Sequence, residues 1–302
     1  MKDINSHFLE GQILIRNMIQ KDIPDLINSG FTFSNIAFNY SLKERIFRAI
    51  NLSPRQLSLV AFHTGKKRAI GFLSLVMHTK TLCSVRYIFT DPNFRKMGVA
   101  TGLINYASIL AKEKRAKRVF LTTDRISDAT RLYQKLGFRK ITEASVLKAE
   151  GCTSIIPTKT KGQLIRLQTR SDKDKNLLFK IYQRSLGQEW INFFETNRDN
   201  LLNGYSQDFQ SLFSKTVFTN DSKEFFAIVF SLPFLHTATA ELYGISDALY
   251  PKMLEVLMRN LLDRGITYVK LFLFNINDLT CFNFLEEKQF YPYQGIYMGR
   301  SL

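Results

Sequence analysis

Hydrophobic positions in the first half of the chain fall into short runs, interrupted by one longer segment with helical spacing. Val99, Leu103, Tyr106 and Leu110 recur every three or four residues, which predicts an amphipathic helix over 98–115. The short runs predict strands, because they are rich in branched and aromatic side chains and end at turn residues. The predicted strands are Gln12 to Asn17, Leu57 to His63, Ala69 to Met77, Leu82 to Thr90, Arg118 to Thr123 and Arg139 to Leu147.

Three further helices complete the first half, and two of them lie between the first and second predicted strands. Pro24 predicts a helix start shortly after residue 20, because proline is tolerated in the first helical turn. Ser127 or Asp128 is expected to cap a short helix that runs to Leu136 and that Gly137 ends. The order of strands and helices predicts a mixed α/β sheet with helices on both faces.

The second half repeats this pattern after a linker at 156–162. Ile165-Arg166 followed by Asp172 matches Ile15-Arg16 followed by Asp22. The predicted elements are strands at Glu224 to Leu232, Thr239 to Ile245, Thr267 to Phe274 and Tyr293 to Met298, with helices at Ala248 to Arg264 and Cys281 to Lys288.

Length and charge support a division into two halves. The 302 residues suit two domains, and we predict them at 1–155 and 163–302, the second a diverged copy of the first. Residues 1–150 hold 25 Lys and Arg against 11 Asp and Glu, a net charge of +14 out of +16. A basic half attracts a phosphorylated cofactor, nucleic acid or an anionic surface. A solvated lysine-rich surface explains the charge equally well, so a nucleic-acid partner stays open.

Cysteine and histidine are too scattered for a metal site or a disulfide framework. We expect no metal, and we expect reduced thiols in a cytosol. The first residues lack the apolar core of a secretory signal and no apolar run is long enough to cross a bilayer, so we expect a cytoplasmic protein without a membrane partner. The sequence does not fix the oligomeric state. The residues concerned are Cys83, Cys152, Cys281, His7, His63, His78 and His236.

The segment from Arg95 to Ala100 has the chemistry of an anion-binding turn. Gly98 lets the backbone approach a ligand without a Cβ clash, and the backbone N–H groups of the following helix supply donors and a partial positive charge. Arg95 and Lys96 add long-range attraction, and Thr101 offers a hydroxyl. This combination predicts a site for a pyrophosphate.

Two segments resemble the motifs of the GCN5-related N-acetyltransferase (GNAT) superfamily. The stretch from Ile88 to Leu103 is similar to motif A, and the stretch from Ala129 to Phe138 is similar to motif B. The similarity extends over about residues 12–147. It implies acetyl-CoA, or a related acyl-CoA, as donor and an unidentified primary amine as acceptor, joined by direct attack in a ternary complex. The matching positions are Pro92, Arg95, Gly98 and Ala100 in motif A, and Ala129, Leu132, Tyr133, Gly137 and Phe138 in motif B.

The resemblance also implies which residues bind the cofactor. The end of a strand should pair with the pantetheine amides, and the turn and first helical residues should surround the pyrophosphate, mainly through their backbones. The implied cofactor-binding residues are Ile88, Phe89, Thr90, Arg95, Lys96, Met97, Gly98, Val99, Ala100 and Thr101.

Acyl transfer needs a proton donor for the departing thiolate and a base for the amine. The superfamily commonly places a tyrosine at the motif B position of Tyr133, which implies that Tyr133 is the general acid. Many relatives carry a glutamate before motif A, whereas the strand here has no carboxylate. Asp124 is our candidate base, with a loop or cap role as its alternative. His78 and Asp91 are weaker candidates, and a water chain or an amine that arrives neutral also stays open.

The second half lacks the residues of both motifs. Pro251 and Glu255 occupy positions that correspond to the anion-binding part of motif A. Leu285 occupies the position that corresponds to Tyr133 of motif B. We expect this half neither to bind acyl-CoA nor to catalyse, but to pack against the first half and wall the acceptor site. Trp190 and the neighbouring phenylalanines either line that site or, as large aromatic residues more often do, fill a core.

Two other functions stay open. The missing glutamate and the diverged repeat favour a non-catalytic acyl-CoA-binding sensor or interaction module. The charge of the first half favours a transferase that acts on a substrate associated with nucleic acid.

Overall fold

The computed structural model divides the chain into two compact units. Unit 1 consists of Met1–Thr122, Arg131–Arg139 and Met298–Leu302, and unit 2 consists of Thr123–Thr130 and Lys140–Tyr297. The boundaries at 155 and 163 stay a proposal. The structure describes residues 6–9, 12–31, 44, 56–124, 127–149, 165–166, 172–196, 214–219, 225–232, 237–244, 250–266, 268–274 and 291–302.

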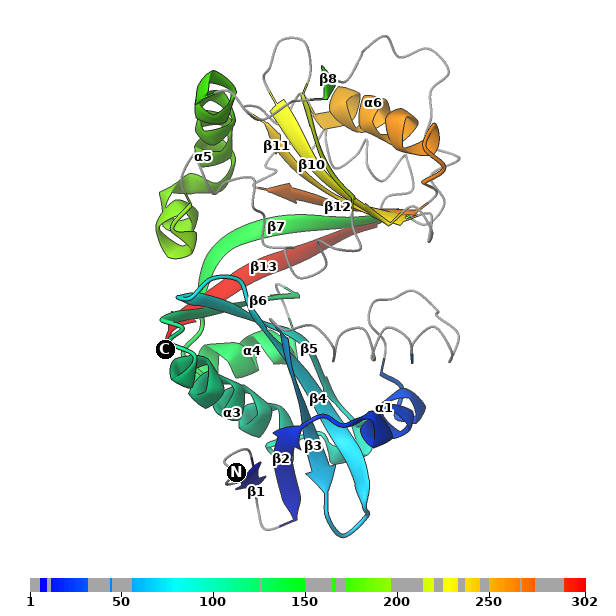
Figure 1. Cartoon of the computed structure of the whole chain (residues 1–302), viewed down its shortest axis with the longest axis vertical. Helices are drawn as coiled ribbons and strands as arrows, with labels where there is room; N and C mark the ends of the chain where they lie inside the picture. Colours follow the sequence, from blue (N-terminus) through cyan, green and yellow to red (C-terminus); the bar gives the residue numbers. More distant parts are fainter. Residues whose placement is uncertain are drawn as a thin grey trace. The chain divides into compact units, whose positions relative to one another are not determined.

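Unit 1 is built on a mixed sheet (Figure 1). Its first five strands pair antiparallel in chain order, and the sixth lies parallel to the fifth. The end of β13 follows β6 in the strand order. The strands are β1 (Ser6–Leu9), β2 (Ile13–Asn17), β3 (Gln56–His63), β4 (Arg68–Met77), β5 (Leu82–Thr90), β6 (Arg118–Asp124) and β13 (Tyr291–Ser301).

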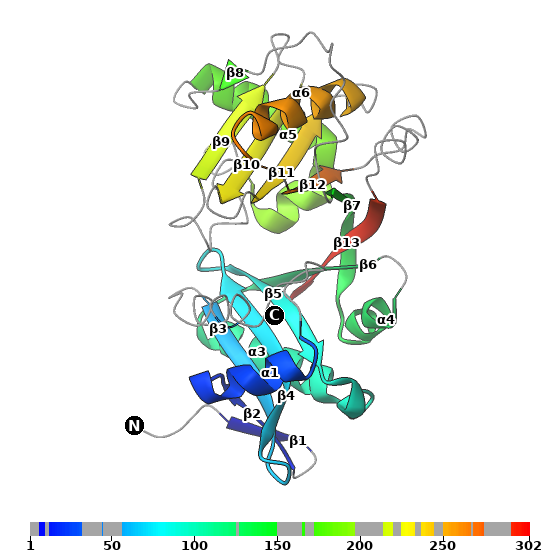
Figure 2. The same cartoon turned by 90° about the vertical axis from the view of Figure 1, so that its right-hand side faces the viewer.

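Helices cover both faces of this sheet. Figures 1 and 2 show α1 and α3 on opposite faces. The α1 face holds a cluster of buried side chains that includes Ile23, Leu26, Val60 and Phe72. The helices are η1 (Gln20–Asp22), α1 (Ile23–Asn28), η2 (Pro92–Phe94), α3 (Val99–Glu113) and α4 (Asp128–Lys135).

An ion pair explains the Arg16 and Asp22 motif that opens the first half. Arg16 donates to both carboxylate oxygens of Asp22, at 2.8 and 2.7 Å. The Ile19 N–H donates to Asp22 Oδ2 at 2.8 Å. Charge-assisted bidentate pairs of this kind fix geometry as well as charge, so the pair holds the end of β2 against the start of α1.

Unit 2 repeats the topology of unit 1. Strands β8 to β11 pair antiparallel in chain order, and β12 lies parallel to β11, with α6 between the two in sequence. β7 pairs antiparallel with β12. The elements are β7 (Arg139–Ala149), β8 (Ile165–Arg166), α5 (Asp172–Phe194), β9 (Ser214–Thr219), β10 (Phe225–Leu232), β11 (Thr237–Gly244), α6 (Tyr250–Leu262) and β12 (Tyr268–Phe274).

Each face of this second sheet has its own core. Met253, Leu257 and Leu261 of α6 pack against alternate residues of β10 to β12. α5 covers the other face, where the Trp190 N–H donates to the Tyr182 hydroxyl at 2.6 Å. Trp190 is 1% exposed, so the interpretation of this residue as core is confirmed.

The predicted fold class is confirmed, and the predicted strands and helices of unit 1 match to within a few residues. The sequence did not predict β1, β9 or α5. The predicted helix at Cys281 to Lys288 and the linker at 156–162 lie outside the described residues. Among the described helices, none combines the length and the apolar character needed to cross a bilayer.

Candidate functional site

The site begins where β5 ends, at a buried carboxylate. Asp91 is 2% exposed and accepts hydrogen bonds from the Asn93 N–H at 2.9 Å and from Arg68 Nη2 at 2.5 Å. Burial alone would raise the pKa of Asp91, but the hydrogen bond from Asn93 and the Arg68 guanidinium outweigh it and hold the pKa below its usual value. A carboxylate held in this way anchors the turn and is a poor proton acceptor.

Two left-handed residues shape the turn that follows. Lys96 has φ +64° and Gly98 has φ +73°, so the backbone reverses sharply before α3. Successive backbone N–H groups in a turn can form an anion-binding concavity. The side chains of Arg95, Lys96 and Met97 are exposed around it.

The N-terminus of α3 offers hydrogen-bond donors that no side chain caps. Gly98 is the N-cap residue and has no side chain, and the first intrahelical bond of this end runs from the Gly102 N–H to the Gly98 carbonyl at 2.8 Å. The N–H groups of Val99, Ala100 and Thr101 therefore have no acceptor within the helix. Together with the helix dipole, they make this end of α3 suited to an anion.

A glycine on the sheet lets the start of α3 come close. A Cβ on Gly71 would lie 2.8 Å from Val99 Cγ1 and 3.2 Å from the Phe89 carbonyl oxygen. Any larger residue at 71 would displace either the first residue of α3 or the end of β5. Gly71 therefore sets the position of the turn relative to the strand.

The edge of β5 facing β6 is open beyond its first residues. Parallel pairing joins Leu82–Ser84 to Arg118–Phe120 and stops there, although β5 continues to Thr90. The register of β4 on β5 shifts beyond Phe72, and Tyr87 adopts φ +55° at this bulge. Within residues 56–124, Ile88 to Thr90 thus have no strand partner on the β6 side. Their backbone N–H and C=O groups that point to that side are available to a ligand.

Tyr133 sits in the C-terminal cap of α4. The Gly137 N–H donates to the Gln134 carbonyl and the Phe138 N–H to the Tyr133 carbonyl, both at 3.0 Å, with Gly137 at φ +83°. This pattern is a Schellman motif, in which the residues bonded across the cap also touch. The Tyr133 and Phe138 rings lie 6.1 Å apart, and Tyr133 is 7% exposed. At the other end of the helix the Ser127 hydroxyl accepts from the Thr130 N–H, as the sequence predicted.

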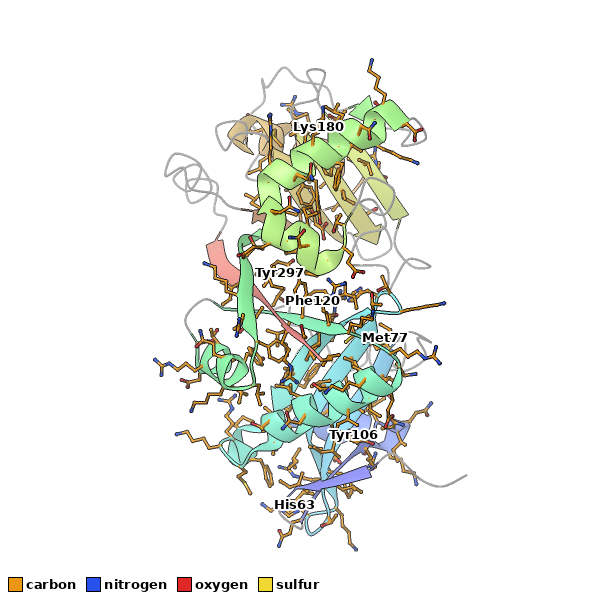
Figure 3. All side chains as sticks on the ribbon, turned by 90° about the vertical axis from the view of Figure 1, so that its left-hand side faces the viewer. His63, Met77, Tyr106, Phe120, Lys180 and Tyr297 are labelled. Carbon is orange, nitrogen blue, oxygen red and sulfur yellow. The ribbon has the colours of Figure 1, made fainter. Side chains whose placement is uncertain are left out.

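The structure describes the side chain of His78, one candidate base, but not that of Asp124, another candidate. Asp124 is the last residue of β6, and its side chain lies outside the described part. His78 Nε2 lies 2.8 Å from Ser84 Oγ, and its ring lies 5.3 Å from that of Phe120, which Figure 3 labels. Ser84 and Phe120 are the last paired residues of β5 and β6. His78 is therefore placed at the closed end of the open strand edge.

Cys83 on β5 is a buried thiol. Burial raises its pKa from 9.0 to about 12, so it is protonated at neutral pH and is not activated as a nucleophile. Among the described residues, no cluster of three His, Cys, Asp or Glu can hold a metal ion.

A family model described as the acetyltransferase (GNAT) family matches residues 23–138. Over this range the chain is similar to a GNAT acetyltransferase domain. The matched range includes the left-handed turn, the open end of β5 and Tyr133. No curated protein matches the sequence at a significant level.

Solved structures share the fold of nearly the whole chain. A GCN5-related N-acetyltransferase from Sphaerobacter thermophilus is 12% identical, with a TM-score of 0.61 and coverage of 97% of each chain. A tandem GNAT protein from the clavulanic acid biosynthesis pathway is 11% identical, with a TM-score of 0.56 and coverage of 96% of this chain and 98% of the other. At these identities the likeness concerns the fold alone.

Sequence reasoning missed three supports of the site. Gly71 had a signal, because a glycine inside a strand often marks a close backbone approach. The ion pair of Arg68 with Asp91 and the bulge at Tyr87 had none, since both depend on the register of β4 against β5.

Proposed function

We propose that the first domain, residues 1–155, transfers an acetyl group from acetyl-CoA to a primary amine. The observation that carries this proposal is an uncapped helix N-terminus at Gly98 that directly follows an open strand edge at Ile88 to Thr90. A pyrophosphate would occupy the turn at Arg95 to Thr101. The pantetheine amides would pair with β5 and point the thioester along the strand.

The proposed reaction is a direct transfer in a ternary complex. The amine nitrogen attacks the thioester carbonyl carbon, and the carbon–sulfur bond breaks as the tetrahedral intermediate collapses. Tyr133 gives its phenolic proton to the departing thiolate, and a base takes the proton that the amine loses. The high pKa of Cys83 supports this route over one through an acylated cysteine.

Asp124 remains our proposed base. Asp91 is unsuited to that role, because Arg68 and Asn93 already hold it as a carboxylate. His78 is the alternative, supported by its hydrogen bond to Ser84 at the closed end of the open edge.

We also propose that the chain is a tandem GNAT protein whose second domain, residues 163–302, is degenerate. The repeated topology of unit 2 supports the shared origin. Pro251, the second residue of α6, supports the loss of an anion site, and the sequence before this helix has no glycine at the position that corresponds to Gly98.

The test is amine-dependent release of free CoA thiol from acetyl-CoA. Wild-type protein should release thiol with at least one member of a panel of small primary amines, peptide N-termini and lysine peptides. Acetyl-CoA binding without turnover across the panel would favour the sensor module. Retention on RNA or DNA columns that weakens with salt, together with acetylation of a bound protein, would favour the nucleic-acid-associated substrate.

A further inference from the structure

Arg300 lies near the end of the chain, on the part of β13 that belongs to unit 1. Its guanidinium makes three contacts in that unit. Nη2 donates to Ser108 Oγ at 2.6 Å, Nη1 donates to the Leu136 carbonyl, and the group lies 4.7 Å from the centre of the Phe138 ring. The arginine thus joins residues that stand far apart in sequence.

The first contact fixes Arg300 to α3. The Ser108 hydroxyl donates to the Ile104 carbonyl at 2.7 Å, so its remaining lone pairs face the arginine. α3 is the helix that begins at the Gly98 turn, and it is a rigid element of four turns. Arg300 is therefore held at a defined place relative to the proposed pyrophosphate site.

The other two contacts complete the cap of α4. Leu136 is the C-cap residue, and its carbonyl is among the last four of the helix, which have no intrahelical donor. A cation there satisfies the carbonyl and interacts favourably with the helix dipole. Phe138, under the guanidinium, is the residue whose ring meets Tyr133 and whose N–H bonds the Tyr133 carbonyl.

We propose that Arg300 is a positioning residue that holds the Tyr133 phenol at a fixed place relative to α3, whose N-terminus forms the proposed pyrophosphate site. This proposal rests on the proposed function. Its guanidinium fork bridges α3 and the α4 cap, and lysine cannot reproduce that geometry with a single ammonium group. The last residues of the chain therefore complete the acyl-CoA domain, and residues 1–155 alone lack this support.

The surroundings of Arg300 are consistent with such a role. The three partners are a hydroxyl, a carbonyl and a ring, and Arg300 Nε is buried without a hydrogen-bond partner among the described residues. Burial lowers the pKa of Arg300. Such an environment costs desolvation free energy, which a residue needed only for solubility would avoid.

The test compares Arg300→Gln and Arg300→Lys with wild type in steady-state kinetics. Both variants should lower kcat, Arg300→Gln by about 10- to 100-fold, with the KM for acetyl-CoA within about twofold, because a displaced acid costs rate while the pyrophosphate turn remains. Ser301→Ala is the matched control, since the neighbouring side chain is exposed on the same strand, and it should keep wild-type kcat. Unchanged kcat in Arg300→Gln would overturn the proposal.

A double variant separates positioning from general destabilisation. In a Tyr133→Phe background, Arg300→Gln should lower kcat by no more than about twofold, because the acid that it positions is already gone. An equal loss of kcat in both backgrounds would contradict the proposal. If Arg300→Gln does not fold, Ser108→Ala serves instead, because it removes the hydrogen bond between Arg300 and α3. Ser108→Ala should lower kcat in the wild-type background but not in the Tyr133→Phe background.

Hydrogen exchange gives a readout independent of catalysis. The amides of Gly137 and Phe138 should exchange faster in Arg300→Gln than in wild type, while those of the first turn of α3 should not change. If wild-type protein transfers no acyl group, the proposed function fails, and exchange decides whether Arg300 supports the cap. Unchanged exchange at Gly137 and Phe138 would refute that support.

Discussion

Val99 Cγ1 occupies the space that a Cβ on Gly71 would need, with only 2.8 Å between the two positions. The first residue of α3 therefore rests directly on the backbone of β4. Because the same helix end supplies the donors for the proposed pyrophosphate site, a substitution at Gly71 that moves this helix end should weaken ligand binding.

Gly71→Ala is expected to weaken acetyl-CoA binding by about tenfold and to lower the melting temperature. Inserting a methyl group into a filled site forces backbone shifts that typically cost about 1–3 kcal/mol. Titration calorimetry measures the affinity. Gly65→Ala is the control, because a Cβ there approaches only the His63 ring, at 3.4 Å. Wild-type affinity in a folded Gly71→Ala protein would show that the contact does not position the turn.

Asp91→Asn is expected to destabilise the protein in a pH-dependent way. Because the pKa of Asp91 is lower in the folded state, its contribution to stability is fully present above the unfolded value of about 3.9 and is lost as pH falls through the folded value. The difference in unfolding free energy between wild type and variant should be largest near pH 7 and shrink below about pH 4. Urea unfolding at several pH values measures it. A difference that stays constant down to pH 3 would contradict the assignment.

Tyr133→Phe is expected to lower kcat for amine acetylation by about 100-fold while acetyl-CoA affinity stays near wild type. Loss of a general acid typically costs between about 10² and 10⁴ in rate. The variant keeps the ring that meets Phe138, so the α4 cap should survive. Thiol release measures kcat, and titration calorimetry measures the affinity for acetyl-CoA. If kcat stays unchanged, another group protonates the thiolate.

Cys83→Ala is expected to keep kcat and the acetyl-CoA affinity of wild type and to lose a modest amount of stability. The thiol is buried and protonated, so it has no part in direct transfer. Mass spectrometry of wild-type protein incubated with acetyl-CoA should find no acetyl group on a β5 peptide. An acetylated Cys83, or a large loss of kcat in the variant, would point to a covalent route.

The sequence predicted the elements whose signals are local. The branched and aromatic residues of 82–90 and the helical spacing of Val99, Leu103, Tyr106 and Leu110 placed β5 and α3 to within about two residues. α5 was missed because Gly187, at φ +79°, interrupts its helical backbone.

Contacts between distant residues could not be predicted from one sequence. Arg300 reaches the Leu136 carbonyl across 164 positions and the Ser108 hydroxyl across 192. No local pattern marks such a pair, since it depends on where β13 lies in the strand order. The motif positions of Gly98 and Tyr133 could be identified, whereas the groups that hold them in place appear only in the fold.

The most direct measurement of the central claim is acetyl-CoA binding to wild type, Gly98→Glu and Asn105→Glu by titration calorimetry. Asn105 is an exposed residue in the middle of α3, so its variant adds the same charge to the same helix away from the turn. We predict that wild type and Asn105→Glu bind acetyl-CoA alike, and that Gly98→Glu loses binding while it remains folded. Equal binding by all three proteins, or binding by none, would contradict an acyl-CoA site at the start of α3.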